Sequence, residues 1–155
     1  MELIEEILSE ENLQKAIRKV KKNKGAPGVD KMTVQEVEEW FNQYKEDLIS
    51  KILNKQYKPM PVKRVYIPKP NGKQRPLGIP TVVDRVIQQA MLQVLNEIYE
   101  PVFSEHSYGF RPNRSAHMAM EEVLGYLNDG YEWIVDLDIE KFFDTVNHDK
   151  LISIL

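Results

Sequence analysis

Apolar residues recur at every third or fourth position in four parts of the chain, which predicts four amphipathic helices. These helices are expected over residues 13 to near 25, 34 to about 54, 82 to about 100 and 116 to about 128. The candidate capping residues are Ser9 or Asn12, Thr33 with Glu36, Thr81 with Asp84, and Ser115. A break near Asn42 is an alternative within the second helix. A fifth helix is expected after Asn147, with the apolar residues Leu151, Ile154 and Leu155.

The third and fourth helices each contain one apolar stripe that we expect to be buried. In the third helix the stripe consists of Ile87, Ala90, Met91, Val94, Leu95, Ile98 and Tyr99. In the fourth it consists of Ala116, Ala119, Met120, Val123, Leu124 and Leu127. Pro101 and the Asp129–Gly130 pair are expected to end these two helices.

Two short β-prone runs flank the dipeptide Asn71–Gly72, which is a strong local signal for a β-hairpin over residues 62–79. Three prolines of this segment, Pro68, Pro70 and Pro76, lack the amide that a central strand must donate. The hairpin is therefore predicted to lie at an edge or to project from the fold.

A second strand is predicted at Trp133–Ile139, where one face is wholly apolar and the other holds Asp136 and Asp138. The chain is then expected to turn through residues 140–144. Two carboxylates at a strand end can hold Mg²⁺ together with phosphate oxygens of a substrate. A solvated strand end, or a phosphatase of the D-x-D type with an aspartate nucleophile, are the alternatives for this pair.

Charge is distributed very unevenly over the 155 residues, although the net charge is only −3. Residues 1–11 hold five acids and no base, and residues 12–85 hold 17 Lys and Arg against 7 Asp and Glu. Residues 86–155 hold 4 bases against 12 acids. This pattern indicates a polyanion-binding surface next to a cation-binding site, with a solvated lysine-rich face as the alternative. Lys69, Lys73 and Arg75 surround the hairpin turn, where they could neutralise a triphosphate.

Several classes of protein are disfavoured by composition. No run approaches the roughly 18 apolar residues of a membrane span, and the acidic N-terminus lacks the basic region of a signal peptide. The sequence contains no cysteine, so disulfides, cysteine zinc sites and thiol nucleophiles are excluded. The three histidines show no metal-ligand spacing. We expect a cytoplasmic protein without a membrane partner.

Four ordered motifs resemble the fingers and first palm motifs of group II intron reverse transcriptases, or maturases. The motifs are VYIPKPNGKQRPLGIP at 65–80, DRVIQQA at 84–90, YGFRPNRS at 108–115 and VDLDIEKFFD at 135–144. The loop over residues 23–30 resembles the N-terminal extension of these enzymes. The resemblance implies an α+β fold. It would be a mostly helical fingers subdomain of a right-hand polymerase, with a projecting β-hairpin and the first strand of the palm sheet.

The resemblance also implies a division of the chain and a role for particular residues. Residues 1–58 would form the N-terminal extension with its template-side loop, 59–130 the fingers, and 131–155 a truncated start of the palm. Asp138 matches the catalytic carboxylate that binds both metal ions, and Ile139 matches a position whose carbonyl is a further metal ligand.

The implied nucleotide and nucleic-acid contacts follow the same matches. Lys69 and Arg75 match cations that bind the dNTP triphosphate, and Phe143 matches the aromatic steric gate against a ribose 2′-OH. The implied contacts to template or primer are Pro68, Leu77 and Ile79 under the templating base, and Asn23, Gly25, Ala26, Arg85, Arg111, Asn113 and Arg114 along the strands. Asp136 and Asp144 match no essential role.

By the same resemblance, the parent protein would be an RNA-directed DNA polymerase that acts in intron splicing and mobility. It would use two Mg²⁺ ions, or Mn²⁺ in their place, and would bind intron RNA, an RNA template, a DNA primer and dNTP. The second palm motif, Tyr-Ala-Asp-Asp or similar, is absent from these 155 residues, so we expect the fragment alone to be inactive.

Two alternative classes stay open, a non-catalytic RNA-binding module and the D-x-D phosphatase. The phosphatase is disfavoured because only 17 residues follow Asp138. The apolar residues of 133–139 and 151–155 are also expected to find a partner, with a homodimer of the fragment as one solution.

Overall fold

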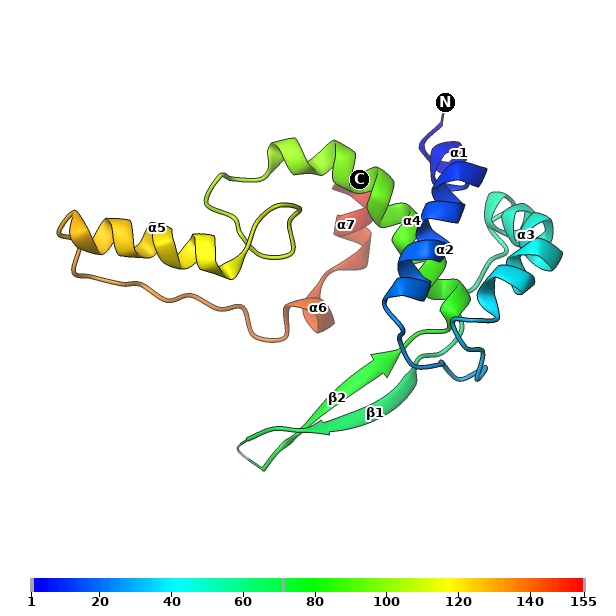
Figure 1. The fold of residues 1–155 in the computed structure, drawn as a ribbon, viewed down its shortest axis with the longest axis horizontal. Coiled ribbons are helices and arrows are strands. Elements are labelled where there is room, and N and C mark those ends of the chain that lie inside the picture. Colours follow the sequence, from blue (N-terminus) through cyan, green and yellow to red (C-terminus); the bar gives the residue numbers. More distant parts are fainter. Residues whose placement is uncertain (1, 71, 155) are drawn as a thin grey trace. The chain divides into compact units, whose positions relative to one another are not determined.

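The computed structural model describes residues 2–70 and 72–154, and it divides into two compact units, Met1–Phe103 and Ser104–Leu155. The first unit contains α1 (Leu3–Ile7), α2 (Glu10–Lys22), α3 (Val37–Leu53), β1 (Lys63–Pro68), β2 (Gln74–Ile79), α4 (Val82–Tyr99) and a 3-10 turn at Glu100–Val102. The second contains α5 (Ala116–Asn128), α6 (Phe142–Thr145) and α7 (His148–Ile154) (Figure 1). This mixture of helices and one antiparallel strand pair agrees with the expected α+β class.

The core of the first unit lies between α1, α2, α3 and α4, and α1, α2 and α4 contact one another directly. Its largest fully buried side chains are Phe41, Leu13, Ile17, Val37, Val82 and Val86. Ser9 is the cap of α2, because its Oγ accepts from the Asn12 amide at 3.3 Å. Asn12 is therefore not the cap. Its side-chain amide is buried and donates to Ile7 O at 2.8 Å and Ala90 O at 3.0 Å, which joins α1 and α4.

Helix α3 is continuous through Asn42 but begins at Val37, three residues later than predicted. Thr33 and Glu36 delay the start because they form a turn of their own. The Thr33 amide and hydroxyl both donate to Glu36 Oε2, at 2.7 and 2.6 Å. The pair thus gives only the glutamate half of a capping box.

Thr81 caps α4 as predicted, since its Oγ1 accepts from the Asp84 amide at 3.2 Å, but the buried face of α4 differs from the expected stripe. Val82, Val83 and Val86 are buried because other segments of the unit cover the first turns of the helix. Met91 and Ile98 are instead 43% and 48% exposed, and Met91 lines an open hollow.

The predicted hairpin is confirmed, with six antiparallel pairs that run from Lys63 opposite Ile79 to Pro68 opposite Gln74. It projects from the helices of the first unit (Figure 1). Gly72 has a φ of +76°, which suits glycine, and its amide donates to Lys69 O at 3.0 Å to close the turn. Asn71, the other half of the turn signal, lies outside the described residues.

The second unit departs most from the sequence-based expectations. No strand is found at Trp133–Ile139, and in this part of the chain the described residues lack the hydrogen-bonded partner that a strand requires. Helix α5 forms as predicted with Ser115 as its cap, yet none of its residues is buried, including the expected interior residues Val123, Leu124 and Leu127. Asn147 Oδ1 accepts from the Lys150 amide at 2.9 Å before α7, as predicted, whereas Leu155 lies outside the described residues. None of the helices described is both long and apolar enough to span a bilayer.

Candidate functional site

The hairpin places the predicted nucleotide-binding cations at its free end. Lys69 directly follows β1, and its amide donates to Lys73 O at 2.7 Å. Arg75 lies on β2 opposite Ile67, two residues before Lys69. All three basic residues of this end are exposed, so they can meet a solvated anion without displacing core side chains.

The strand register separates the three apolar residues expected under a templating base. Residues directly opposite each other share a face of the hairpin. Leu77 and Ile79 therefore lie on the same face as Arg75, whereas Pro68 is paired with Gln74 and lies on the other face. The structure brings Leu77, Ile79 and Arg75 together as one half-exposed surface, and it does not bring Pro68 to it.

A buried carboxylate, Asp84, lies at the base of the hairpin. It is 4% exposed and accepts from Thr81 Oγ1 at 2.6 Å, from the Met60 amide at 3.2 Å and from the Tyr57 hydroxyl. Burial, followed by the hydrogen bond and the charge of Asp84, raises the pKa of Tyr57 well above its usual value. Sequence reasoning identified Asp84 as the partner of the Thr81 cap and as the first residue of the DRVIQQA motif, but it gave this carboxylate no contact with the hairpin. The signal for more was an acid inside the apolar run Val82–Val86.

The loop over residues 23–30 is fastened to the beginning of α4 through Arg85. Its Nη2 donates to Ala26 O at 2.7 Å, and its Nε donates to Thr81 O at 3.4 Å. The guanidinium also fills the space next to Gly25. Burial lowers the pKa of Arg85, and the charge of Asp30 opposes this. The structure thus brings Gly25, Ala26 and Arg85 together, while Asn23 is exposed at the end of α2. Contacts of these residues with template or primer stay a prediction.

Gly28 in the same loop is buried against the backbone of Pro80 and Thr81, where the chain leaves the hairpin. A β-carbon on Gly28 would lie 2.8 Å from Thr81 Cα, which is closer than such atoms approach in proteins. The loop, the hairpin exit and the start of α4 therefore form one tightly packed junction.

In the second unit, Arg111 and Arg114 fold the loop that precedes α5. Arg111 Nη1 donates to Ser104 O at 2.6 Å and Ser107 O at 3.0 Å, and Arg114 Nη1 donates to Glu105 O at 3.1 Å. These bonds give both arginines a structural function, and their contacts with nucleic acid stay a prediction. Asn113 is exposed with a φ of +59°.

Glu122 on α5 is the centre of a hydrogen-bonded cluster that sequence reasoning missed. It accepts from the hydroxyls of Tyr108 and Tyr126 and contacts the ring of His106. The hydrogen bond from Tyr108, then that from Tyr126, lower the pKa of Glu122. Arg114 lies over the Tyr108 ring at 5.4 Å from its centroid. The cluster ties the YGFRPNRS loop to α5.

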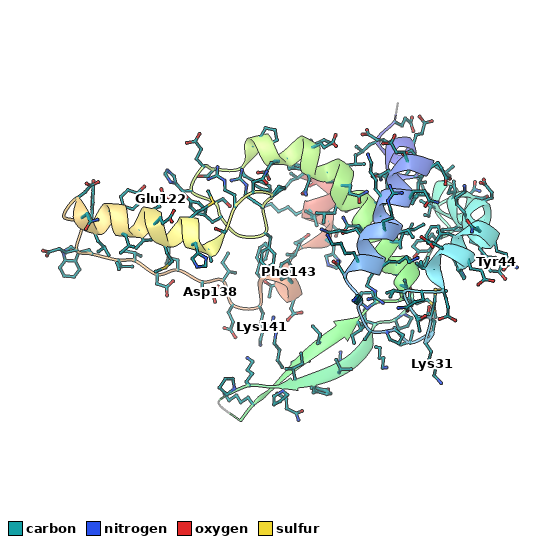
Figure 2. The ribbon with its side chains drawn as sticks, in the orientation of Figure 1. Lys31, Tyr44, Glu122, Asp138, Lys141 and Phe143 are labelled. Atoms are coloured by element: carbon teal, nitrogen blue, oxygen red, sulfur yellow. The ribbon has the colours of Figure 1, made fainter. Side chains whose placement is uncertain are left out.

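Asp138, Ile139 and Phe143 lie in the exposed part of the second unit. Asp138 is on the extended trace and Phe143 on α6, where its side chain is 90% exposed (Figure 2). The Asp138 carboxylate and the Ile139 carbonyl are oxygen ligands of the kind Mg²⁺ prefers. Among the described residues, no three acidic or histidine side chains come close enough to hold a metal ion together. These residues fit part of a magnesium site and require further ligands to complete it.

One family model and several known proteins match the sequence of this chain. The model described as "Reverse transcriptase (RNA-dependent DNA polymerase)" matches residues 67–155, more than half of the chain. This match begins within β1 and therefore includes the hairpin end, the YGFRPNRS loop and Asp138.

Three relatives illustrate the similarity. Protein YkfC of Escherichia coli (strain K12) is 41% identical over 157 residues, which cover 97% of this chain and 41% of that protein. Group II intron-encoded protein LtrA of Lactococcus lactis subsp. cremoris is 41% identical over 135 residues, 86% of this chain and 22% of that protein. Nuclear intron maturase 2, mitochondrial, of Arabidopsis thaliana is 38% identical over 72 residues, 46% of this chain and 10% of that protein. The chain spans less than half of the length of each of these relatives.

Proposed function

Because this chain belongs to the reverse transcriptase family, with the group II intron reverse transcriptases and maturases, we propose that it forms the template- and nucleotide-binding part of an RNA-directed DNA polymerase. The family resemblance seen in the four ordered motifs is confirmed. Our assignment of residues 1–58 to the N-terminal extension, 59–130 to the fingers and 131–155 to the start of the palm belongs to the proposal.

The observation that carries the proposal is the matched hairpin with its cationic end. Lys69 and Arg75 are exposed at this end, and Arg75 shares a face with Leu77 and Ile79. A cation beside an apolar surface suits a nucleotide, whose triphosphate needs positive charge and whose base and sugar prefer apolar contact. Base pairing with the template would supply the sequence information, so the protein needs only to bind backbone and shape.

Asp138 and the Ile139 carbonyl are the proposed contributions of this chain to two Mg²⁺ ions. When bound, such ions activate the primer 3′-OH and stabilise the leaving pyrophosphate. Further carboxylates must complete the centre, so we propose that the 155 residues alone bind substrates without joining nucleotides. The same proposal names intron RNA, an RNA template, a DNA primer and dNTP as partners, in a cytoplasmic setting.

The test of this function is the Asp138→Asn variant of the complete polymerase that includes this sequence. It removes one negative charge from the metal site and keeps the side-chain shape, so primer extension on an RNA template should fall by orders of magnitude. Asp136→Asn is the matched control and should extend nearly normally, because that residue matches no metal ligand. Near-normal extension by the Asp138 variant would overturn the assignment.

RNA binding can be tested on the chain itself. Residues 12–85 hold ten more basic than acidic residues, so binding should fall steeply as salt rises, because each neutralised phosphate releases counterions. The slope of log affinity against log salt, measured by filter binding, gives the number of phosphates contacted. Salt-dependent RNA binding by a complete protein that never incorporates nucleotides would favour the non-catalytic module instead.

Self-association of the chain is a further part of the proposal. The side chains of Trp133 and Leu137 are 94% and 88% exposed, and apolar surface of this kind favours burial against a partner. Sedimentation at rising concentration should show a dimer, and a strictly monomeric chain would contradict it.

A further inference from the structure

We propose that Asp84 is a positioning residue that holds both legs of the β1–β2 hairpin and thereby sets where Lys69 and Arg75 present their charges. The effect on nucleotide use rests on the function proposed above for the hairpin. The hydrogen bonds of Asp84, which we call the clamp, lie within the first unit alone. They can therefore be tested independently of nucleotide use.

One carboxylate contacts the chain on both sides of the hairpin. On the entry side, the Met60 amide donates to Asp84 Oδ2 at 3.2 Å, three residues before β1 begins, and the Tyr57 hydroxyl donates to Oδ1. On the exit side, Thr81 Oγ1 donates to Oδ2 at 2.6 Å, two residues after β2 ends. Asp84 therefore joins the two legs just where they leave the core.

The burial of Asp84 makes these hydrogen bonds obligatory. Its neighbours Val82, Val83 and Val86 are buried, and a charge in such surroundings is costly unless donors surround it. An asparagine has one acceptor oxygen and an NH₂ group that can only donate. With its oxygen toward Met60 and Thr81, an asparagine could no longer accept from Tyr57, and every remaining hydrogen bond would lose its charge assistance. Asp84→Asn should therefore weaken the hold on the entry leg.

Among the described residues of β1 and β2, no side chain is buried in the core of the first unit. Every described residue of β1 and β2 is exposed or half-buried, and each strand makes its regular contacts with the other strand. Six strand residues at about 3.3 Å each give a hairpin about 20 Å long, so a rotation of 10° at its base would move its end by roughly 3 Å. A displacement of that size exceeds what a charge-assisted hydrogen bond tolerates.

The clamp can be tested by distance measurement in the 155-residue chain, which contains no cysteine of its own. Spin labels at Gln74→Cys near the hairpin end and Lys22→Cys at the end of α2 should give one narrow distance distribution. Asp84→Asn and, to a smaller extent, Tyr57→Phe should broaden it. Asp47→Asn is the matched control, because that carboxylate is exposed on α3 and pairs with Lys51 in the same helix at 2.6 Å.

The test is decisive even if Asp84→Asn prevents folding. Tyr57→Phe removes one of the two entry-side hydrogen bonds and leaves the carboxylate bonded to Met60 and Thr81. Tyr57→Phe with an unchanged, narrow distribution would overturn the clamp. A distribution broadened equally by the Asp47 control would also overturn it, because the effect would then not come from the hairpin base.

Kinetics of the complete polymerase then separate the clamp from the function of the hairpin. Tyr57→Phe should raise the dNTP KM about three- to tenfold and leave kcat and RNA affinity nearly unchanged, as expected when only ground-state positioning is lost. If Lys69→Ala leaves the dNTP KM unchanged, the proposed nucleotide role fails while the distance result can stand. If Lys69→Ala raises KM and Tyr57→Phe alters neither KM nor distance, the clamp alone is wrong.

Discussion

Replacing Gly28 with alanine should destabilise the first unit, because the added methyl group has no space. An ideal β-carbon would lie 2.8 Å from Thr81 Cα, 2.9 Å from Thr81 N and 3.0 Å from Pro80 C. All three are backbone atoms of the hairpin exit, which cannot rotate away as a flexible side chain would. Gly28 is not among the glycines with positive φ, so this close approach and not the backbone conformation determines the cost.

The magnitude follows from the cost of overpacking, which is about 1–3 kcal/mol for an extra carbon in a well-packed site. For a unit of roughly 100 residues, 1 kcal/mol corresponds to a change of about 4–8 °C in melting temperature. We therefore expect Gly28→Ala to lower the melting temperature of the first unit by at least about 4 °C.

Tryptophan fluorescence is a suitable assay because the chain has two tryptophans in contrasting surroundings. Trp40 packs against Phe41 in the first unit at 5.3 Å between ring centroids, whereas Trp133 is 94% exposed and should change little on unfolding. Gly109→Ala is the control, since nothing lies within 4 Å of a β-carbon there. An unchanged melting temperature for Gly28→Ala would refute the close contact between the loop and the hairpin exit.

The hairpin, α6 and the half-buried Tyr57 allow three more predictions. Lys69→Ala and Arg75→Ala should each raise the dNTP KM of the complete polymerase about tenfold, since a charge-assisted hydrogen bond contributes ~1.5–3 kcal/mol; lost RNA affinity with an unchanged KM would contradict this. Phe143→Ala should leave the melting temperature unchanged, because the ring is 90% exposed, and should raise the rNTP/dNTP incorporation ratio; the reverse result would make Phe143 a core residue. The fold raises the pKa of Tyr57, chiefly by burial, so its stabilising contribution is complete below the unfolded pKa of about 10 and is lost as pH rises above it; urea titrations at high pH should show a larger loss of stability in the parent chain than in Tyr57→Phe.

The features that the sequence predicted well depend on neighbouring residues. Ser9, Thr81 and Ser115 cap their helices through amides only three residues away, and the hairpin needs only a turn between two short runs. Trp133–Ile139 was predicted wrongly because a strand exists only with a partner, which no period-two pattern can supply. The buried face of α4 was predicted only in part for the same reason. Ala90 and Val94 are buried as expected, whereas the exposure of Met91 and Ile98 depends on which segments cover the helix.

The same contrast between local and long-range features applies to the candidate site. Motif order was enough to identify the family and to select Lys69, Arg75 and Asp138 for testing. The hydrogen bond from Tyr57 to Asp84 spans 27 positions, and that from Arg85 to Ala26 spans 59, so neither could be inferred from spacing. Only the structure shows that Arg85 fastens the loop over residues 23–30 to α4.

The solvent-exposed hairpin has a consequence for how its sequence can vary. Since the described residues of β1 and β2 contribute nothing to the buried core, substitutions there should change the free energy of unfolding very little. Which substitutions β1 and β2 tolerate would then depend on ligand contact and on strand pairing alone. Under the function proposed above, a mutational scan selected for polymerase activity should report the nucleotide preference directly at hairpin positions, whereas positions in α2 and α4 would mix that preference with effects on folding. Laboratory evolution of altered substrate use should find its first changes on this hairpin, where new side chains can be sampled without loss of the fold.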